Sequence, residues 1–286
     1  NVSPYINQPN HLYGWLGWLM FASLLVWAIY RFWNKDFKPE RFSIKWLIFL
    51  FLLVPFTTFL FGFSFPAQFA APIPGIPGES NTPVVLLFSA VPWMLAVGMV
   101  GPFYALLIAL LQGMVRSAWF SHNLFTILET VSVAFLFLLI VNQRFRTRIY
   151  HFLRKPFFAA CVVCVGLFFV TIISTLCTVQ GSIAVRIDYF LTRGWWGFLA
   201  RCLELLIAAC VVELVKRFKP ALWIKPKPLI PSLSEISIQW KFNRTTILVG
   251  IAFFLSVFMI DWLAAGYMAS RLIENSLKSN AKIISQ

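Results

Sequence analysis

Long apolar runs separated by short polar segments constrain this chain more than any other feature. Each run has about 20 mainly apolar residues, the length that a helix needs to cross the hydrocarbon core of a bilayer. Hydrophobic residues make up 60% of the 286 residues, and charged residues only 12%. An ordinary soluble domain is about 45–50% apolar and about 25% charged. The sequence therefore predicts an all-α polytopic membrane protein, and it excludes a soluble enzyme, a disordered chain and a coiled coil.

The runs predict eight transmembrane helices, over residues 13–33, 46–65, 83–99, 102–120, 122–142, 157–178, 195–215 and 246–267. We separate the third from the fourth at Gly98, Gly101 and Pro102, which supply turn chemistry within a continuous apolar stretch. With this division, the basic clusters within residues 31–45, 144–155 and 216–244 all lie on one side of the membrane. The positive-inside rule makes that side cytoplasmic. Both termini are then expected to be extracytoplasmic.

The formal net charge of +14 raises the question of nucleic-acid binding. The basic residues, however, fall in short clusters between apolar runs rather than along one polar face. This pattern is typical of a multi-pass protein that contacts anionic lipid headgroups. We therefore expect membrane lipids as partners and no nucleic acid, in the plasma (inner) membrane of a bacterium.

The segments between and after the runs differ in character. Residues 66–82 are rich in Pro and Gly and are expected to form an outer loop, and residues 218–240 are expected to be an extended inner loop on the headgroups. In residues 268–286, the apolar residues Leu272, Ile273, Leu277, Ile283 and Ile284 lie among polar ones, which predicts an amphipathic helix at the outer surface. We interpret them as the start of a stalk in a chain that continues beyond Gln286. The alternative is an interfacial helix that closes the protein.

Ionisable residues inside the apolar runs are the candidate functional residues, because each costs about 2.5–3.5 kcal/mol at the centre of a membrane helix. Arg201 and Glu204 are spaced i, i+3 and share a helix face. One interpretation is that such groups only join helices, with Glu129 meeting Arg201 or Arg116. The other is an outward-opening pocket for a small polar or zwitterionic ligand, rimmed by Trp119, Trp195 and Trp196. Its candidate ligand-binding residues are Gln112, Arg116, Glu129, Trp195, Arg201, Glu204 and Asp261.

Neither a cofactor nor a catalytic centre is expected. Cys161 and Cys164 share a helix face, but no His or second Cys pair accompanies them, and a zinc site needs more ligands. The three His residues are scattered and cannot form one cluster. No serine-hydrolase, phosphate-loop, zinc-protease or dinucleotide-binding motif occurs. We therefore expect no enzyme activity within this segment.

Gly101-Pro102, followed by an apolar helix with Gly113 and Arg116 and then by His122 and Glu129 on the next helix, resembles the multi-pass sensor regions of bacterial signalling proteins. In those proteins such regions precede kinase, cyclase or phosphatase modules. The same pattern is similar to the substrate-binding subunits of energy-coupling-factor vitamin transporters. The resemblance covers residues 83–142. It implies a homodimeric input module with output domains or partner subunits, or a transport component with an energising partner.

Three functions stay open from the sequence. The first is a sensor that binds a small ligand from the outer side or relays a signal through the last helix. The second is the substrate-binding component of a small-solute transporter. The third is a structural or assembly subunit whose ion pairs only hold helices together.

Overall fold

The computed structural model describes residues 4–6, 8–9, 12–36, 44–65, 71–72, 80–81, 83–223, 229–230, 246–247 and 249–250. The chain divides into two units, residues 1–229 and residues 230–286. In the second unit the described residues from 246 to 250 are helical. The predicted span 246–267, the stalk 268–286 and Asp261 therefore lie almost wholly outside the described residues.

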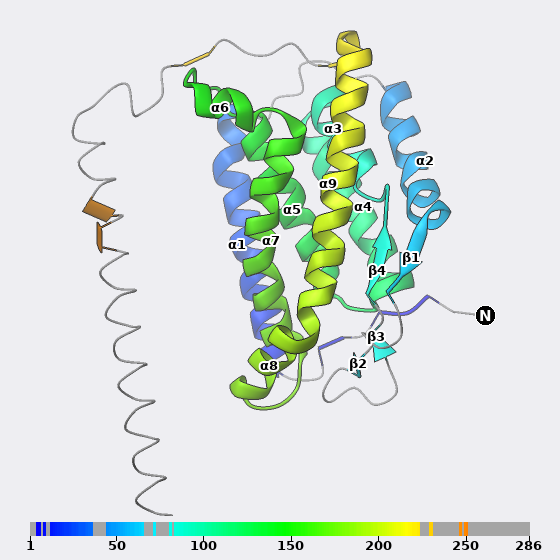
Figure 1. The fold of residues 1–286 in the computed structure, drawn as a ribbon, viewed down its shortest axis with the longest axis vertical. Coiled ribbons are helices and arrows are strands. Elements are labelled where there is room, and N and C mark those ends of the chain that lie inside the picture. The colour runs from blue at the N-terminus through cyan, green and yellow to red at the C-terminus, as the bar shows by residue number, and fades with distance from the viewer. Residues whose placement is uncertain are drawn as a thin grey trace, which may run out of the picture. The chain divides into compact units, whose positions relative to one another are not determined.

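The first unit is a bundle of helices, shown in Figure 1. Its helices are α1 (Leu12–Asp36), α2 (Ile44–Leu60), α3 (Val91–Met99), α4 (Pro102–Arg116), α5 (Phe125–Val141), α6 (Arg148–Leu153), α7 (Pro156–Thr178), α8 (Ile183–Tyr189) and α9 (Trp195–Phe218). Short strands β1 (Gly62–Ser64), β2 (Ala71–Pro72), β3 (Ser80–Asn81) and β4 (Val84–Leu86) lie between α2 and α3. Strands β1 and β4 pair antiparallel, as do β2 and β3.

Among the described residues, three helical segments are long and apolar enough to cross a membrane: Leu12–Phe32, Pro102–Ser121 and Pro156–Thr178. Ile44–Leu60 and Phe125–Val141 are apolar but shorter. Helix α9 has 24 residues but carries charged residues along its length. The mostly helical fold agrees with the predicted all-α class. Large apolar side chains such as Trp27, Val165 and Phe169 lie exposed on the outer faces of α1 and α7, as is typical of surfaces that meet lipid.

The predicted helix 83–99 is wrong over its first half. Residues 84–86 form β4, in which Leu86 pairs with Gly62 and Val84 pairs with Ser64. The helix begins only at Val91, with Pro92 in its first turn, where a missing N–H costs nothing. β-Branched Val84 and Val85 favour the strand. The nine-residue helix that remains is too short to span a bilayer on its own.

Helix α3 lies at the centre of the core. All nine of its residues are buried, and it contacts α2, α4, α5 and α9. Trp93 packs edge-to-face on Phe137 of α5, with ring centroids 5.5 Å apart. At Gly98 a side-chain carbon would overlap the indole of Trp223. This helix is therefore enclosed by its neighbours rather than by solvent or lipid.

The predicted break between the third and fourth runs is confirmed at Gly101. Its φ of 119° lies in the region that glycine adopts without strain, and Pro102 starts α4 directly after it. The N–H groups of Val100 and Gly101 both donate to the carbonyl of Ala96 and end α3. The ends of α1, α4, α5, α7 and α9 agree with the predicted spans to within a few residues. Helix α2 ends at Leu60, before the predicted end, because β1 follows.

The two predicted loops are only partly described. In the outer segment 66–82, the described residues 71–72 and 80–81 form the β2–β3 pair. In the inner segment 218–240, residues Pro220–Leu222 form a 3₁₀ turn where an extended chain was predicted. Figure 1 shows that β2, β3 and α8 lie at one end of the bundle and α6 at the other.

Candidate functional site

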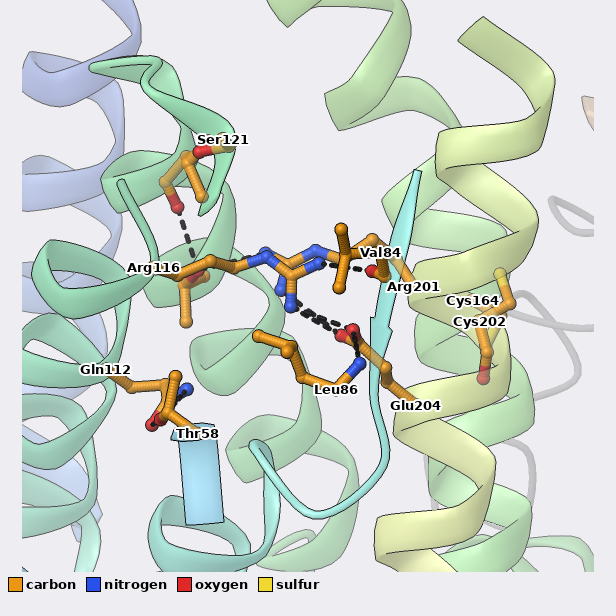
Figure 2. A network of polar contacts seen from close by, with 12 residues as sticks. Thr58, Val84, Leu86, Gln112, Arg116, Ser121, Cys164, Arg201, Cys202 and Glu204 are labelled. Carbon is orange, nitrogen blue, oxygen red and sulfur yellow. Dashed lines mark hydrogen bonds and ion pairs between the residues drawn. The ribbon is translucent and has the colours of Figure 1, made fainter. Parts of the chain in front are cut away.

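Glu204 of α9 is the centre of a buried polar network, drawn in Figure 2. Only 2% of its surface is exposed. Its two carboxylate oxygens accept hydrogen bonds from Nη1 of Arg116 on α4, at 2.9 Å and 2.7 Å. The backbone N–H of Leu86 on β4 donates to Oε1 at 2.6 Å. These donors replace the hydrogen bonds to water that the carboxylate loses on burial.

Arg201 extends the network along α9 and across to α5. Its Nη1 lies 3.5 Å from Oε2 of Glu204, which confirms the predicted i, i+3 pair. Its Nη2 donates to Oγ1 of Thr130 on α5 at 3.0 Å. On the other side, Nη2 of Arg116 approaches the carbonyl of Val84 at 3.4 Å. One carboxylate thus connects α4, α9 and β4, and Arg201 adds α5.

Gln112 belongs to a separate pair one turn earlier on α4. Its Nε2 donates to Oγ1 of Thr58 on α2 at 3.0 Å. The hydroxyl of Thr58 in turn donates to the carbonyl of Val54 at 2.7 Å. Both side chains are buried. Gln112 therefore joins α2 to α4, and its amide is not directed at a ligand cavity.

A cavity of about 190 Å³ lies next to the network, at the end of the bundle that carries α8. It is smaller than the roughly 300–1,000 Å³ typical of sites for drug-sized ligands, so an occupant must be small. Its charged and aromatic lining comprises Arg116, Phe120, Glu129, Tyr189, Arg193, Phe198 and Arg201. Five helices, α4, α5, α7, α8 and α9, contribute residues to its wall.

The charges around this cavity do not cancel locally. Arg116, Arg201 and Glu204 together keep one net positive charge. Glu129 of α5 lines the cavity and attracts Arg201 electrostatically, yet it makes no hydrogen bond or ion pair with any described residue. The cavity therefore has a cationic wall formed by α4 and α9 and a carboxylate on α5.

The polar lining also includes hydroxyl groups. Thr171, Ser174, Thr175 and Thr178 of α7 all line the cavity, and their spacing puts them on one helix face. The hydroxyls of Thr171, Thr175 and Thr178 donate to the carbonyl one turn earlier in α7. Their oxygen lone pairs are still available to accept a donor from a ligand. This stripe is visible in the sequence as polar residues at helical spacing, and the charge-based analysis missed it.

Tyr189 is the other residue that the sequence analysis missed. It lies at the end of α8 and lines the cavity together with Arg193. Burial raises the pKa of its phenol above the usual value of 10, and Arg193 opposes this effect. The phenol is therefore neutral at physiological pH and can donate a hydrogen bond.

The structure brings only part of the predicted pocket together. Arg116, Glu129 and Arg201 line the cavity, whereas Glu204 and Gln112 lie behind its wall. The predicted tryptophan rim is wrong for the described lining, in which Phe120, Phe198 and Tyr189 supply the aromatic rings. Trp195 packs instead on Phe198 and Phe168, with ring centroids 5.2 Å and 6.2 Å away. Glu129 was predicted to pair with Arg201 or Arg116, but both arginines form their ion pairs with Glu204.

Cysteine and histidine residues form no metal centre in the part of the chain that the structure describes. No group of three His, Cys, Asp or Glu residues there could hold a metal ion. The thiol of Cys164 contacts the carbonyl of Cys202 at 3.9 Å, so it packs between α7 and α9. His122, with a φ of 48°, stacks on the ring of Tyr5 at 3.9 Å.

Comparisons of the chain with protein-family models, with curated proteins and with solved structures find no match.

Proposed function

We propose that this chain is a multi-pass input module of a bacterial signalling protein, and that it senses a small zwitterionic solute. In this proposal the chain crosses the inner membrane eight times, with β4, the turn after it and α3 together making the third crossing, and the cavity beside Glu204 opens to the extracytoplasmic side. The three long apolar helical segments support the membrane location. The basic residues near α6 and the end of α9 support the orientation, because positive residues favour the cytoplasmic side.

The separation of charge around the cavity is the observation that carries this proposal. An amino-acid-sized zwitterion can direct its carboxylate at Arg201 and Arg116 and its ammonium at Glu129, which has no ion-pair partner among the described residues. Such a ligand would neutralise both walls at once. Charge-assisted hydrogen bonds to guanidinium and carboxylate groups are among the strongest available to a small ligand.

The position of the cavity supports a sensing role. It lies where α4, α5, α7 and α9 meet, so a bound solute contacts groups on several helices. Helix α9 runs as one segment from Arg201 to the basic residues Lys216 and Arg217 in its last turn. A ligand that pulls Glu129 towards Arg201 would favour one arrangement of α5 against α9. That shift is the signal that we propose α9 carries across the membrane.

The number of partners that Glu204 already has favours a second candidate function, that of a structural subunit. Its carboxylate already has Arg116, Arg201 and the Leu86 N–H as partners. In this alternative the network only joins helices, and the cavity holds water. Glu129 distinguishes the two candidates, because a purely structural role gives this carboxylate nothing to bind.

The test uses the full chain in nanodiscs, with glycine as the probe and acetate and methylammonium as its two halves. Isothermal titration calorimetry should detect the binding of glycine. Acetate and methylammonium should each bind more weakly than glycine by about tenfold or more, since each lacks one of the two charge-assisted contacts. Glu129→Gln should weaken glycine binding by a similar factor. Glu213→Gln, which removes a carboxylate at the other end of the bundle, is the matched control and should leave glycine binding unchanged.

Hydrogen–deuterium exchange separates sensing from simple binding. A sensor should show glycine-dependent changes in exchange at the last turns of α9, far from the cavity. Changes confined to the lining residues would support a transport component. If glycine does not bind, or if Glu129→Gln and Glu213→Gln behave alike, the zwitterion proposal is wrong.

A further inference from the structure

A second cavity lies at the opposite end of the bundle, between α6, the start of α7 and the end of α9 (Figure 1). Its volume is about 820 Å³, within the range of roughly 300–1,000 Å³ typical of ligand sites. Four Lys and Arg side chains line it, Arg154, Lys155, Lys216 and Arg217, together with His151. This cavity shares no residue with the one beside Glu204.

The only carboxylate in the described lining of this second cavity is already in use. An oxygen of Glu213 accepts a hydrogen bond at 3.2 Å from the backbone N–H of Phe157, in the first turn of α7. This contact stabilises a helix N-terminus whose own N-cap residue, Lys155, provides no capping bond. The fold thus directs the Glu213 carboxylate from α9 to the start of α7. Positive charge is therefore in excess around the cavity.

The ammonium of Lys216 lies close enough to Glu213 and Arg154 to be affected by both charges. Burial lowers the pKa of its ammonium from the usual 10.5, Glu213 opposes the effect, and the nearby Arg154 adds to it. An anion in the cavity would relieve the repulsion between these cations. Arg154 and Lys155 are half-buried, so a bound anion would also be partly shielded from water.

Apolar side chains form the rest of the cavity wall. Phe158 and Leu214 line it and are 42% and 53% exposed. Cys210 lies next to them. A free phosphate ion would gain nothing from these groups, whereas an amphipathic molecule would cover them with hydrocarbon.

We propose that this cavity binds an anionic phospholipid, with the phosphate among Arg154, Lys155 and Lys216 and the acyl chains along Phe158 and Leu214. The proposal depends on the membrane location proposed above but not on the sensing function. A phosphatidylcholine headgroup carries a cation that these side chains repel. Phosphatidylglycerol offers the same phosphate without that cation, so it should be preferred. Basic pockets between helices at the cytoplasmic surface recognise anionic headgroups by this chemistry.

The experiment measures lipid binding to the full chain in detergent by native mass spectrometry. Phosphatidylglycerol and phosphatidylcholine with identical acyl chains are titrated against it. The wild-type protein should retain phosphatidylglycerol preferentially. Arg154→Gln together with Lys216→Gln should weaken that binding by about tenfold or more, since each basic residue near the membrane surface contributes about fivefold.

The matched control is Arg148→Gln together with Lys219→Gln. These two residues are exposed at the same end of the bundle but do not line the cavity. They should leave the preference for phosphatidylglycerol in place. An equal loss in both double variants would mean that general surface charge attracts the lipid, and it would overturn the proposal.

Two further measurements keep the proposal testable if Arg154→Gln with Lys216→Gln folds poorly. Glu213→Gln removes the opposing charge but keeps an oxygen acceptor for the Phe157 N–H, so it should strengthen phosphatidylglycerol binding. Unchanged or weaker binding would contradict the proposal. Inorganic phosphate at equal concentration should not displace the lipid; displacement would identify a small-anion site and rule out the lipid as its ligand.

Discussion

Nη1 of Arg116 lies 2.7 Å from Oε2 of Glu204, although the two residues are 88 positions apart in the chain. Both side chains are nearly inaccessible, with 8% and 2% of their surfaces exposed. A buried ion pair of this kind is costly to break from one side, because the remaining charge loses its main partner. This pair is therefore where we expect the largest effect of a single substitution.

Replacing Arg116 by Ala should lower the free energy of unfolding by about 3 kcal/mol or more, since it leaves the Glu204 carboxylate buried with only Arg201 and a backbone N–H. Unfolding in detergent, followed by circular dichroism, measures the change. Arg148→Ala, at an exposed position on α6, should change the stability by no more than about 0.5 kcal/mol. A similar, small effect of both substitutions would show that the pair contributes little to stability.

The close contact between α4 and α5 depends on Gly113. A Cβ added there would lie 3.0 Å from the Cα of Ile127 and 3.3 Å from the Cβ of Thr130. Gly113→Ala should therefore force the helices apart and cost about 1–3 kcal/mol, as overpacking does elsewhere. Melting temperatures of the purified variants test this.

Gly197 of α9 is the matched control for Gly113, because a Cβ there meets no atom within 4 Å. Gly197→Ala should be neutral or stabilise the protein by up to about 1 kcal/mol through helix propensity. If both alanine variants melt at the wild-type temperature, the packing described for α4 and α5 is wrong.

Glu213 should contribute to stability as a cap supplied by a neighbouring helix. Glu213→Ala removes the acceptor for the Phe157 N–H and should cost about 0.5–2 kcal/mol, the usual range for a lost N-cap. Glu213→Gln keeps an oxygen in the same place and should cost less. Equal losses in the two variants would mean that the charge, and not the hydrogen bond, is what matters.

Lys216 should make stability increase with pH on the alkaline side. Burial lowers its pKa in the folded state below the usual 10.5. The negative charge of Glu213 opposes this decrease in pKa, and the positive charge of Arg154 adds to it. Between those two pKa values the unfolded chain binds more protons, so raising the pH favours the folded state. Tyr189, whose pKa burial raises, contributes with the opposite sign once its unfolded value of 10 is passed.

Comparison of the wild-type protein with Lys216→Met isolates the Lys216 contribution to this pH dependence. The difference in unfolding free energy between the two should shift in favour of the wild type as the pH approaches 10.5 from below. A difference that is constant with pH would show that the pKa of Lys216 is the same in both states.

The same titration should control lipid binding. Loss of the Lys216 proton removes one cation from the lipid cavity, so phosphatidylglycerol retention should fall as the pH rises through the lowered pKa. Lys216→Arg keeps its charge over this range and should remove that pH dependence. An unchanged pH profile in this variant would assign the effect to another group.

The sequence by itself determined the helical fold class and the break at Gly101, because both depend on local properties. Runs of apolar residues favour helices whatever they pack against. A glycine before a proline separates two helices by its own backbone preferences. The sequence also determined that Arg201 and Glu204 are neighbours, since side chains three residues apart lie on the same face of a helix.

Only the tertiary structure decided which charges meet across the bundle. Arg116 was a candidate partner for Glu129, but it binds Glu204, and Glu129 lines the cavity instead. The same holds for residues 83–90, where an apolar run forms β4 and a turn: β4 pairs with β1, and the N–H of Leu86 donates to Glu204. An apolar run predicts that its residues are buried, but a short run does not show whether they form a helix or a strand. Ion pairs between residues far apart in the chain depend on how the helices pack, which no local sequence pattern encodes.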